Sequence, residues 1–383
     1  MAGVWDLAVV GAGPAGAAAA LGALSARPEA RVLLLDRAGF PRDKSCGDGI
    51  APQAVEVLER LGAAGVVDGF RPVHRLRLGF AGSEPVVGTM RRAAYVVPRA
   101  VFDARVVEAA VARGAVLQQH RVRTVDRLAD RVVLDGAVVA RVVVAADGAG
   151  SDVRRQVAVA DPQRGHVAVA IRGYAPVGAG REAEQVITFA PDGWPAYAWS
   201  FPVGDGRANV GYGEVLGDDA VTQSHLLARL GDLLPGAADG ASRWRAHHLP
   251  LSSGRPRQPD GRVLLAGDAL SLVNPLTGEG IFYAVLSGAL AGEAAVTAPT
   301  DPGRAYRRAL RREMGRHLRH TTVVAALARR RWVAEAGVVA ARGNGLVFDD
   351  LVEVGLGRGL VGPRLVAGLA SGLAVTAVRG GRR

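Results

Sequence analysis

The chain has 383 residues, of which 49% are hydrophobic and 22% charged, so it can bury a large core and is too apolar for a disordered protein. Its formal charge of +11 comes almost entirely from arginine, since Lys44 is its single lysine. No nucleic-acid-binding motif accompanies this charge, so we expect no nucleic-acid partner. One cysteine, Cys46, excludes an intrachain disulfide framework, and the scattered histidines favour no metal site. The single cysteine fits a reducing cytoplasm, so we expect a cytoplasmic protein. No uninterrupted apolar run of roughly 20 residues is found, which predicts that the chain does not span a membrane.

The first predicted elements surround a glycine-rich turn. An apolar run at residues 7–10 is typical of a buried strand, and an alanine-rich helix is expected up to about residue 26. Between them, Gly11 permits a tight turn, Gly13 lets the backbone approach a pyrophosphate, and Gly16 lets the helix pack on the strand. The next strand ends on Asp36, which would accept hydrogen bonds from an adenosine ribose. The unit predicts a dinucleotide site but leaves FAD and NAD open.

The middle of the chain mixes helical and extended patterns. The expected elements are helices at residues 52–61 and 99–113, a hairpin turning at Asp135 and Gly136, and buried strands at residues 142–145 and 263–266. From residue 166 to about 250, apolar and polar residues alternate, which predicts an antiparallel sheet. From residue 278 onward the chain is expected to be mostly helical.

A second strand-to-turn motif lies in the last third of the chain. The strand at residues 263–266 ends on Gly267 and Asp268, and residues 274–280 (Asn-Pro-Leu-Thr-Gly-Glu-Gly) open the following helix. Asp268 is placed to bind a ribityl hydroxyl. Backbone N–H groups of residues 277–280 would face a flavin pyrimidine and stabilise negative charge on the reduced ring. Together with the N-terminal unit, this motif favours FAD over NAD.

Residues 144–151 form a third segment that runs from a strand into an Asp-Gly pair at Asp147. These three signatures, in this order, resemble the superfamily of flavin monooxygenases and reductases with the para-hydroxybenzoate hydroxylase fold. In that superfamily the Asp-Gly element lies between the flavin and the route of the pyridine nucleotide, and an arginine matching Arg99 lies beside the flavin. A structural turn at Asp147 and a surface position for Arg99 are the alternatives.

A narrower resemblance concerns residues 40–49, around Cys46, and residues 197–202 (Tyr-Ala-Trp-Ser-Phe-Pro). Both segments resemble the geranylgeranyl reductase family, whose members saturate carbon–carbon double bonds of isoprenoid chains, and with the flavin motifs the resemblance spans most of residues 4–290. Archaeal members often carry a lysine after the proline. Val203 stands there in this chain, which leaves room for a neutral prenylated substrate.

The resemblance implies an FAD-dependent oxidoreductase that saturates the isoprenoid chain of a prenyl lipid or a menaquinone by hydride transfer. Its reductant would be NAD(P)H or an external electron carrier, because the chain has no cysteines for an iron–sulfur cluster. An FAD-dependent monooxygenase or epoxidase acting on an aromatic or prenylated substrate is the alternative.

The fold implied by the resemblance is of the α/β class. It combines a Rossmann-like FAD-binding domain of the glutathione-reductase-2 or para-hydroxybenzoate hydroxylase type with an inserted antiparallel-sheet substrate domain and a helical C-terminus. The expected boundaries are 1–72, 99–165 and 261–300 for the FAD-binding domain, 73–98 and 166–260 for the substrate domain, and 301–383 for the C-terminal helical region.

The implied cofactor-binding residues lie on the three motifs and around the cysteine. They are Gly11, Gly13, Ala15, Gly16, Asp36, Arg37, Cys46, Gly47, Arg99, Asp147, Gly267, Asp268, Pro275, Gly278, Gly280 and Ile281. Cys46 is also the candidate catalytic residue, because a thiol in a glycine-containing loop could relay a proton or tune the flavin. A small buried side chain is the alternative.

Aromatic residues at Tyr197, Trp199 and Phe201 alternate along one strand and therefore share a face. They are candidates for the wall of an apolar substrate channel, or else they pack in the core.

The C-terminal region carries a different pattern. Its basic positions with helical spacing are Arg304, Arg308, Arg311, Arg312 and Arg319. Residues 365–378 are largely apolar and precede a basic tail at residues 379–383. The pattern fits peripheral contact with an anionic membrane that holds a lipid substrate. A solvated helix face beside a core-packing helix is the alternative.

Overall fold

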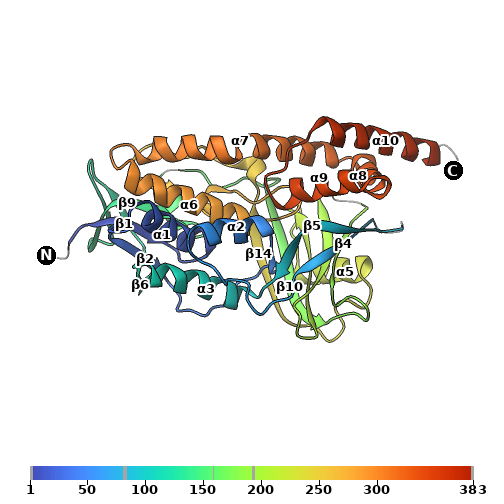
Figure 1. Cartoon of the computed structure of the whole chain (residues 1–383), viewed down its shortest axis with the longest axis horizontal. Helices are drawn as coiled ribbons and strands as arrows, with labels where there is room; N and C mark the ends of the chain where they lie inside the picture. The colour runs from blue at the N-terminus through green and yellow to red at the C-terminus, as the bar shows by residue number, and fades with distance from the viewer. Residues whose placement is uncertain (1–2, 81–83, 158, 192–194, 381–383) are drawn as a thin grey trace.

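The protein is described by a computed structural model that covers residues 3–80, 84–157, 159–191 and 195–380, without the side chains of residues 374–380. The last residues of the basic tail, 381–383, lie outside this range. Two β-sheets occupy opposite halves of an elongated molecule, and the C-terminal helices extend along one side of both halves (Figure 1). The fold is the expected α/β FAD-binding type with a helical C-terminus.

The first sheet has seven strands and a parallel centre. Its strands are β1 (Trp5–Val10), β2 (Val32–Asp36), β6 (Val116–Gln119), β7 (Val125–Arg127), β8 (Val132–Leu134), β9 (Val138–Ala145) and β15 (Val263–Leu265). The order β6-β2-β1-β9 is parallel throughout, and β15 pairs in parallel with the end of β9. The predicted hairpin joins β8 to β9, with Asp135 at φ 50° and Gly136 at φ 66°, the left-handed values that a two-residue hairpin turn requires.

The second sheet has eight strands. They are β3 (Gly49–Ile50), β4 (Val73–Phe80), β5 (Val86–Val96), β10 (Val167–Pro176), β11 (Glu184–Phe189), β12 (Ala196–Pro202), β13 (Arg207–Val215) and β14 (Ser242–Pro250). The order is β14-β10-β13-β12-β11-β4-β5-β3, and β10 to β14 pair antiparallel as predicted. One pair differs from the expected pattern: β11 lies parallel to β4, a strand far earlier in the chain.

Helices cover both sheets. Their bounds are α1 (Pro14–Ala26), α2 (Pro52–Arg60), α3 (Arg99–Ala112), α4 (Asp152–Gln156), α5 (Gln223–Leu233), α6 (Ile281–Thr297), α7 (Pro302–Ala328), α8 (Arg331–Gly343), α9 (Gly345–Leu356) and α10 (Pro363–Gly380). The early helices begin and end within a residue of their predicted limits, because each starts at a proline or an arginine after extended backbone and ends near a glycine or a polar residue.

Helices α1 and α6 pack backbone to backbone. A Cβ added to Gly288 would lie 2.0 Å from the Ala15 carbonyl oxygen, and one added to Gly292 would lie 1.9 Å from that of Ala19. Side chains larger than hydrogen therefore have no room at these positions. Because both helices are nearly all buried, this close contact fixes where their N-termini lie.

The C-terminal helices extend the core of the second sheet. Val338 and Phe348, on α8 and α9, pack with Leu76 and Met90, on β4 and β5. The long helix α7 runs from the first sheet towards the second, and α8, α9 and α10 lie at its far end (Figure 1). The C-terminal region thus closes one side of the space between the two halves.

Candidate functional site

A cavity of about 980 Å³ is walled by residues of both sheets and of the C-terminal helices. The carboxyl ends of three parallel strands reach it through Val10, Asp36 and Ala266. Ligands of open parallel sheets bind at this edge, where the loops after the strands diverge. The cavity is therefore the candidate site.

The glycine turn after β1 forms one end of the cavity. Gly11 has φ +96°, and a Cβ there would lie 2.4 Å from the Ala146 carbonyl oxygen, so only glycine fits. Gly13 is the N-cap of α1 and contributes no side-chain cap, so the first N–H groups of the helix remain available on the side of the cavity. Such a helix N-terminus is a ready anion site, which suits a pyrophosphate.

Asp36 lies beside this turn at the end of β2. Its carboxylate accepts hydrogen bonds from the backbone N–H of Ala12 (2.8 Å) and of Ala38 (2.9 Å). Arg42 lies 3.6 Å from the same carboxylate and 3.3 Å from that of Asp103. These contacts hold Asp36 in place on the wall of the cavity.

Asp268 lies on the wall of the same cavity, in the turn after β15. Its carboxylate is 3.3 Å from the Nζ of Lys44, the one lysine of the chain. Burial alone would raise the pKa of Asp268, but Lys44 and His247 outweigh it and hold that pKa below its ordinary value. Asp268 is therefore an ionised carboxylate at neutral pH, which makes it a strong acceptor for the hydroxyl group of a sugar-like chain.

The N-terminus of α6 faces the cavity close to Asp268. Its N-cap, Gly280, provides no side-chain cap, and Gly278 has φ +68° with a Cβ position only 3.0 Å from the hydroxyl of Tyr197. The hydroxyl of Tyr197 donates to the carbonyl oxygen of Thr277. The aromatic strand and the glycine motif thus meet at this helix end.

Glu279 is a site residue that the sequence analysis missed. Its side chain lies on the cavity wall and accepts a hydrogen bond of 2.8 Å from the backbone N–H of Phe282. Burial raises the pKa of Glu279 to about 7, although the N–H groups of Phe282 and Ile281 act in the opposite direction. A carboxyl group that exchanges its proton near neutral pH therefore lies at the N-terminus of α6.

Cys46 lies on the loop that faces the other motifs across the cavity. Burial raises the pKa of its thiol, although the neighbouring guanidinium of Arg99 lowers it, so the thiol stays protonated at neutral pH. Arg99 is buried and makes a two-point ion pair with Asp103, at 2.6 and 2.9 Å. The surface alternative for Arg99 is therefore wrong: it lies in the cavity wall beside Cys46.

Asn209, a second missed residue, ties the Cys46 loop to the aromatic strand. Its amide nitrogen donates to the Cys46 carbonyl oxygen and to the Asp48 carboxylate, both at 2.8 Å, and its amide oxygen accepts from the indole of Trp199 at 2.9 Å. Burial raises the pKa of Asp48, against hydrogen bonds from Tyr174 and Asn209. Asn209 uses both of its amide hydrogens and its amide oxygen on three parts of the site and therefore fixes their relative positions.

The predicted aromatic run lies along the cavity. Tyr197, Trp199 and Phe201 all line it, and successive ring centroids are 5.9 and 6.4 Å apart. A Cβ on Gly47 would lie 3.5 Å from both Trp199 and Phe201, so the cysteine loop passes directly over the rings. The aromatic run and the cysteine loop thus line the cavity side by side.

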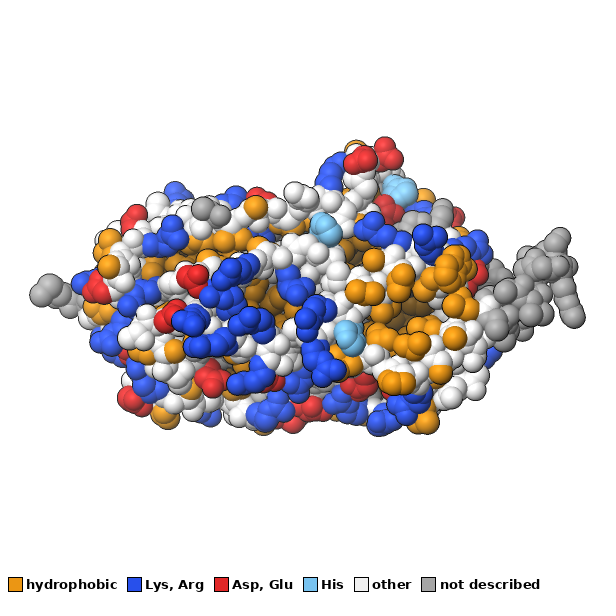
Figure 2. All heavy atoms as spheres, turned by 90° about the horizontal axis from the view of Figure 1, so that it is seen from above, with side chains coloured by type: hydrophobic (Ala, Val, Ile, Leu, Met, Phe, Trp, Pro, Cys, Tyr) orange, Lys and Arg blue, Asp and Glu red, His pale blue; other side chains and the backbone are white. Residues whose placement is uncertain are grey.

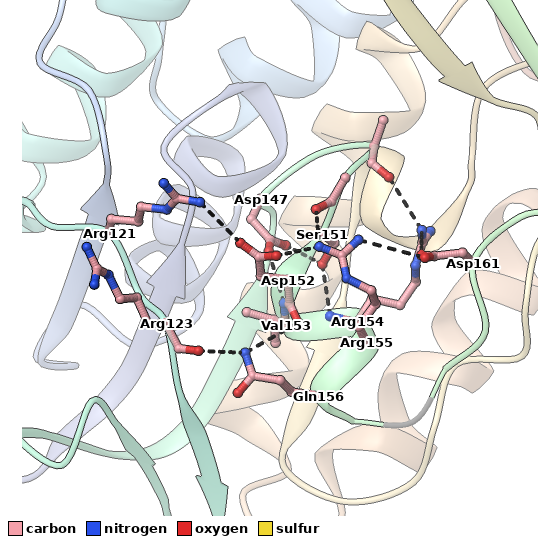
Figure 3. Close-up of polar contacts among 12 residues, drawn as sticks. Arg121, Arg123, Asp147, Ser151, Asp152, Val153, Arg154, Arg155, Gln156 and Asp161 are labelled. Atoms are coloured by element: carbon pink, nitrogen blue, oxygen red, sulfur yellow. Dashed lines mark hydrogen bonds and ion pairs between the residues drawn. The ribbon is translucent and has the colours of Figure 1, made fainter.

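Asp147 stabilises a turn, which is the structural role that the sequence analysis gave as the alternative to a place beside the electron-donor route. Its carboxylate accepts from the Ser151 hydroxyl at 2.6 Å and from the Val153 N–H at 3.2 Å, and the Ser151 oxygen in turn caps α4. Figure 3 shows these three residues pointing towards one another at the turn before the helix. Asp147 also lines the cavity, so its proposed place near the electron-donor route stays a prediction.

The cavity collects nearly all of the predicted site residues. Those that line it are Gly11, Gly13, Ala15, Asp36, Arg37, Cys46, Gly47, Arg99, Asp147, Tyr197, Trp199, Phe201, Asp268, Pro275, Gly278, Gly280 and Ile281. Gly16 and Gly267 are not among the lining residues. A Cβ on Gly16 would lie 1.7 Å from the Gly11 carbonyl oxygen, so this glycine serves helix–strand packing. Gly267, at φ +59°, makes the turn that presents Asp268.

These residues fit FAD. The N-termini of α1 and α6 both face one cavity; α1 has no side-chain cap, whereas the Glu279 carboxyl group accepts from the Phe282 N–H at the start of α6. The carboxylates of Asp36 and Asp268, one from each motif, lie on the wall of this cavity. The first helix end suits the pyrophosphate, and the second suits the electron-rich edge of a flavin. Glycines at the points of closest approach leave room for the backbone to contact the cofactor.

Comparisons with known proteins agree with this geometry. A family profile described as "FAD binding domain" matches residues 5–289. The chain is 36% identical over 317 residues to a menaquinone reductase from Mycolicibacterium smegmatis, covering 75% of each chain. It is 34% identical over 318 residues to digeranylgeranylglycerophospholipid reductase 1 from Methanopyrus kandleri, covering 77% of this chain and 81% of the relative.

Among solved structures, a geranylgeranyl bacteriochlorophyll reductase-like protein from Thermoplasma acidophilum superposes with a TM-score of 0.78, at 20% identity and with 96% of each chain covered. At that identity the match supports the fold. In the described part of the chain, none of the helices combines the length and the apolar character needed to span a bilayer. The profile match and the relatives together place the chain in the geranylgeranyl reductase family of FAD-dependent oxidoreductases.

Proposed function

We propose that this enzyme saturates carbon–carbon double bonds of an isoprenoid chain, in a prenyl lipid or the side chain of a menaquinone. The observation that carries the proposal is the apolar arm of the cavity beyond the cofactor motifs. The residues that line this arm are Leu76, Leu78, Ala94, Ile187 and Phe189 from the second sheet and Val333, Val338, Leu351, Val352, Leu365 and Leu369 from the C-terminal region. An extended hydrocarbon chain fits such a wall and excludes water from it.

We propose that FAD is held by the N-terminus of α1 at its pyrophosphate, by Asp36 at its ribose and by Asp268 at its ribityl chain. Reduced FAD, when bound, supplies the hydride that reaches one carbon of the double bond. The N–H groups at the start of α6 would stabilise the electron-rich edge of the ring. Arg99 and Asp103, buried as a pair, would keep the Cys46 loop against this ring.

The other carbon of the double bond needs a proton, and Glu279 and Cys46 on the cavity wall are candidate donors. We propose Glu279 as the donor, because its carboxyl group exchanges protons near pH 7 and lies at the α6 N-terminus. Cys46 is the second candidate. Its raised pKa keeps the proton on the sulfur atom, so the thiol would orient or tune the flavin rather than donate the proton freely. Hydride and proton together add two hydrogen atoms per double bond.

Several finer assignments belong to this proposal. The two sheets would divide the work, with residues 1–72, 99–165 and 261–300 holding the cofactor, residues 73–98 and 166–260 holding the substrate, and residues 301–383 closing the cavity. Tyr197, Trp199 and Phe201 would guide the isoprenoid chain, and NAD(P)H or an external carrier would reduce the flavin. A lipid substrate implies peripheral contact with a membrane through the C-terminal region.

The test uses purified holoenzyme, reduced in the absence of oxygen and mixed with a geranylgeranyl lipid or a menaquinone. We expect the flavin to reoxidise and the product to gain two hydrogen atoms per saturated bond, measured by mass spectrometry. A product that forms only with molecular oxygen and carries a labelled oxygen atom would overturn the proposal in favour of a monooxygenase. Flavin-free protein is the control.

A further inference from the structure

Exposed large apolar side chains gather on the C-terminal helices, beside the cavity. Five of them form what we call the apolar rim: Val323 (57% exposed), Leu327 (53%), Trp332 (50%), Leu360 (36%) and Val366 (54%). Each is the direct chain neighbour of a residue that lines the cavity, namely Val324, Ala328, Val333, Val361 and Leu365. The apolar rim therefore lies beside the apolar arm of the cavity.

The surface view shows the same arrangement. In Figure 2 apolar side chains surround a hollow over the end of α7 and the neighbouring helices, and basic side chains crowd the adjoining surface over the first part of α7. Water-exposed apolar patches that surround an opening are unusual in soluble proteins and mark a surface that contacts something apolar.

One face of α7 connects the two surfaces. Arg308, Arg312, Arg316 and Arg319 follow each other at spacings of three and four residues, and Val323 and Leu327 continue the same row. All six side chains are exposed. A single helix face thus changes from cationic to apolar as it reaches the opening.

The charge of this region has one dominant sign. Residues 301–383 contain 16 arginines against six acidic residues, so they carry ten of the eleven net positive charges of the chain. Within the described part of the structure, Arg308, Arg316 and Arg319 have no carboxylate within ion-pairing distance, whereas Arg312 pairs with Glu313. Unneutralised arginines beside an apolar opening complement a surface that is anionic outside and apolar inside.

We propose that the apolar rim and the arginine row of α7 dock on an anionic phospholipid bilayer, so that an isoprenoid chain enters the cavity directly from the membrane. This proposal rests on the proposed function, because it assumes a membrane-held substrate. The five rim side chains would enter the boundary between headgroups and acyl chains, and the arginines would contact lipid phosphates. The substrate would then pass from one apolar environment to another without crossing water.

The test is flotation of the full-length holoenzyme with vesicles of pure phosphatidylcholine and with vesicles of equal parts phosphatidylcholine and phosphatidylglycerol. We expect binding to the anionic vesicles that weakens as salt is added. The triple variant Arg308→Gln, Arg316→Gln and Arg319→Gln should lose about a hundredfold in vesicle affinity, from the loss of three cationic side chains at the surface. A matched triple of exposed arginines elsewhere, Arg60→Gln, Arg71→Gln and Arg127→Gln, should bind like wild type.

The apolar part of the surface is tested by Val323→Glu with Leu327→Glu, which should abolish binding even at low salt. The control pair Val111→Glu with Leu128→Glu changes other exposed apolar residues, away from the apolar rim, and should not alter binding. The arginine triple of α7 and the Val323→Glu, Leu327→Glu pair should both keep wild-type turnover of a short isoprenoid in detergent. Both should lose turnover of an isoprenoid that is embedded in vesicles. That pattern separates docking from chemistry, since failure of the proposed function would abolish turnover in detergent as well.

Three results would overturn the proposal. Wild-type protein could fail to float with anionic vesicles, or the two arginine triples could bind alike. Alternatively, wild-type protein could be a dimer by light scattering that becomes monomeric when Val323 and Leu327 are changed, which would assign the apolar rim to a second copy of the chain.

Discussion

Two opposing effects act on the carboxyl group of Glu279. It accepts a hydrogen bond from the backbone at the start of α6, which favours the ionised form, and it is buried enough to hold its proton up to about pH 7. Small changes around it, such as the arrival of a substrate, would therefore change its protonation. A group of this kind suits a reaction in which proton supply must be matched to hydride arrival.

Changing Glu279 tests this role. With wild type, we expect the rate at which substrate reoxidises the reduced flavin to fall as the pH rises through about 7, because only the protonated carboxyl group donates. Glu279→Gln should slow this step by roughly a hundredfold and remove the pH dependence. Stopped-flow absorbance of the flavin measures both effects.

The control for this experiment is Cys46→Ser, which keeps a small polar group on the opposite loop. It should retain the wild-type pH profile, even if its rate changes. If instead the profile disappears with Cys46→Ser and survives in Glu279→Gln, the proton comes from the cysteine side of the cavity.

At the scale of elements, the contact between α1 and α6 matters most, because both helices present their N-termini to the cavity. Adding a methyl group to Gly288 places it 2.0 Å from the Ala15 carbonyl oxygen, so the helices must separate. We expect Gly288→Ala to cost about 1–3 kcal/mol in the free energy of unfolding and to weaken FAD binding. Urea denaturation and fluorescence of released flavin measure the two effects.

Gly231 provides the matched control. It lies on the exposed side of α5 with nothing within 4 Å of its Cβ position. Gly231→Ala should stabilise the protein by up to about 1 kcal/mol through helix propensity alone and leave flavin binding unchanged. Equal effects at both glycines would mean that the α1–α6 contact yields more easily than the structure indicates.

Local elements were predictable because their signals are local. The glycine turn before α1 and the Asp135-Gly136 hairpin need particular backbone angles that few residues adopt. The residue types at these positions therefore predict both turns. The parallel pairing of β11 with β4 joins segments about a hundred residues apart, and the sequence of neither strand identifies the strand with which it pairs. Periodicity predicts that a strand exists but not which strand lies beside it.

The same distinction between local and long-range signals applies to the residues of the site. The motif glycines and their flanking acids were predictable from the sequence. Glu279 was missed because only the backbone N–H groups of its motif were considered. A carboxyl residue between two glycines at a helix start was the available signal. Asn209 had no such signal, since its role depends on Cys46 and Trp199 meeting it from distant segments. His317, one of the scattered histidines, is hydrogen-bonded to the Tyr283 hydroxyl and to the Gly359 carbonyl oxygen in the core.

At the scale of the whole molecule, one extended cofactor would bridge parts of the chain that are far apart in sequence. Asp36 ends strand β2 of the first sheet, Asp268 lies in the turn after strand β15, and the Cys46 loop packs on the second sheet. We expect FAD at about a hundred times its Kd to stabilise flavin-free protein by roughly 2.7 kcal/mol, and FMN to stabilise it less, because FMN leaves the Asp36 end without a ligand. Thermal denaturation measures the difference.

The control here is Asp36→Asn, which should bring the effect of FAD down towards that of FMN without changing the FMN result. Equal stabilisation of wild type by both flavins would mean that the adenosine half contributes little to binding.

The loop between β2 and β3 holds both the one lysine and the one cysteine of the chain, two residues apart, and both lie on the cavity wall. Lys44 is the one side-chain amine that an acylating reagent can modify, besides the terminal amine, and Cys46 is the one thiol that an alkylating reagent can modify. Alkylation of the intact protein is thus directed to Cys46 alone, and a dye or spin label attached there would report from inside the cavity without any engineered residue.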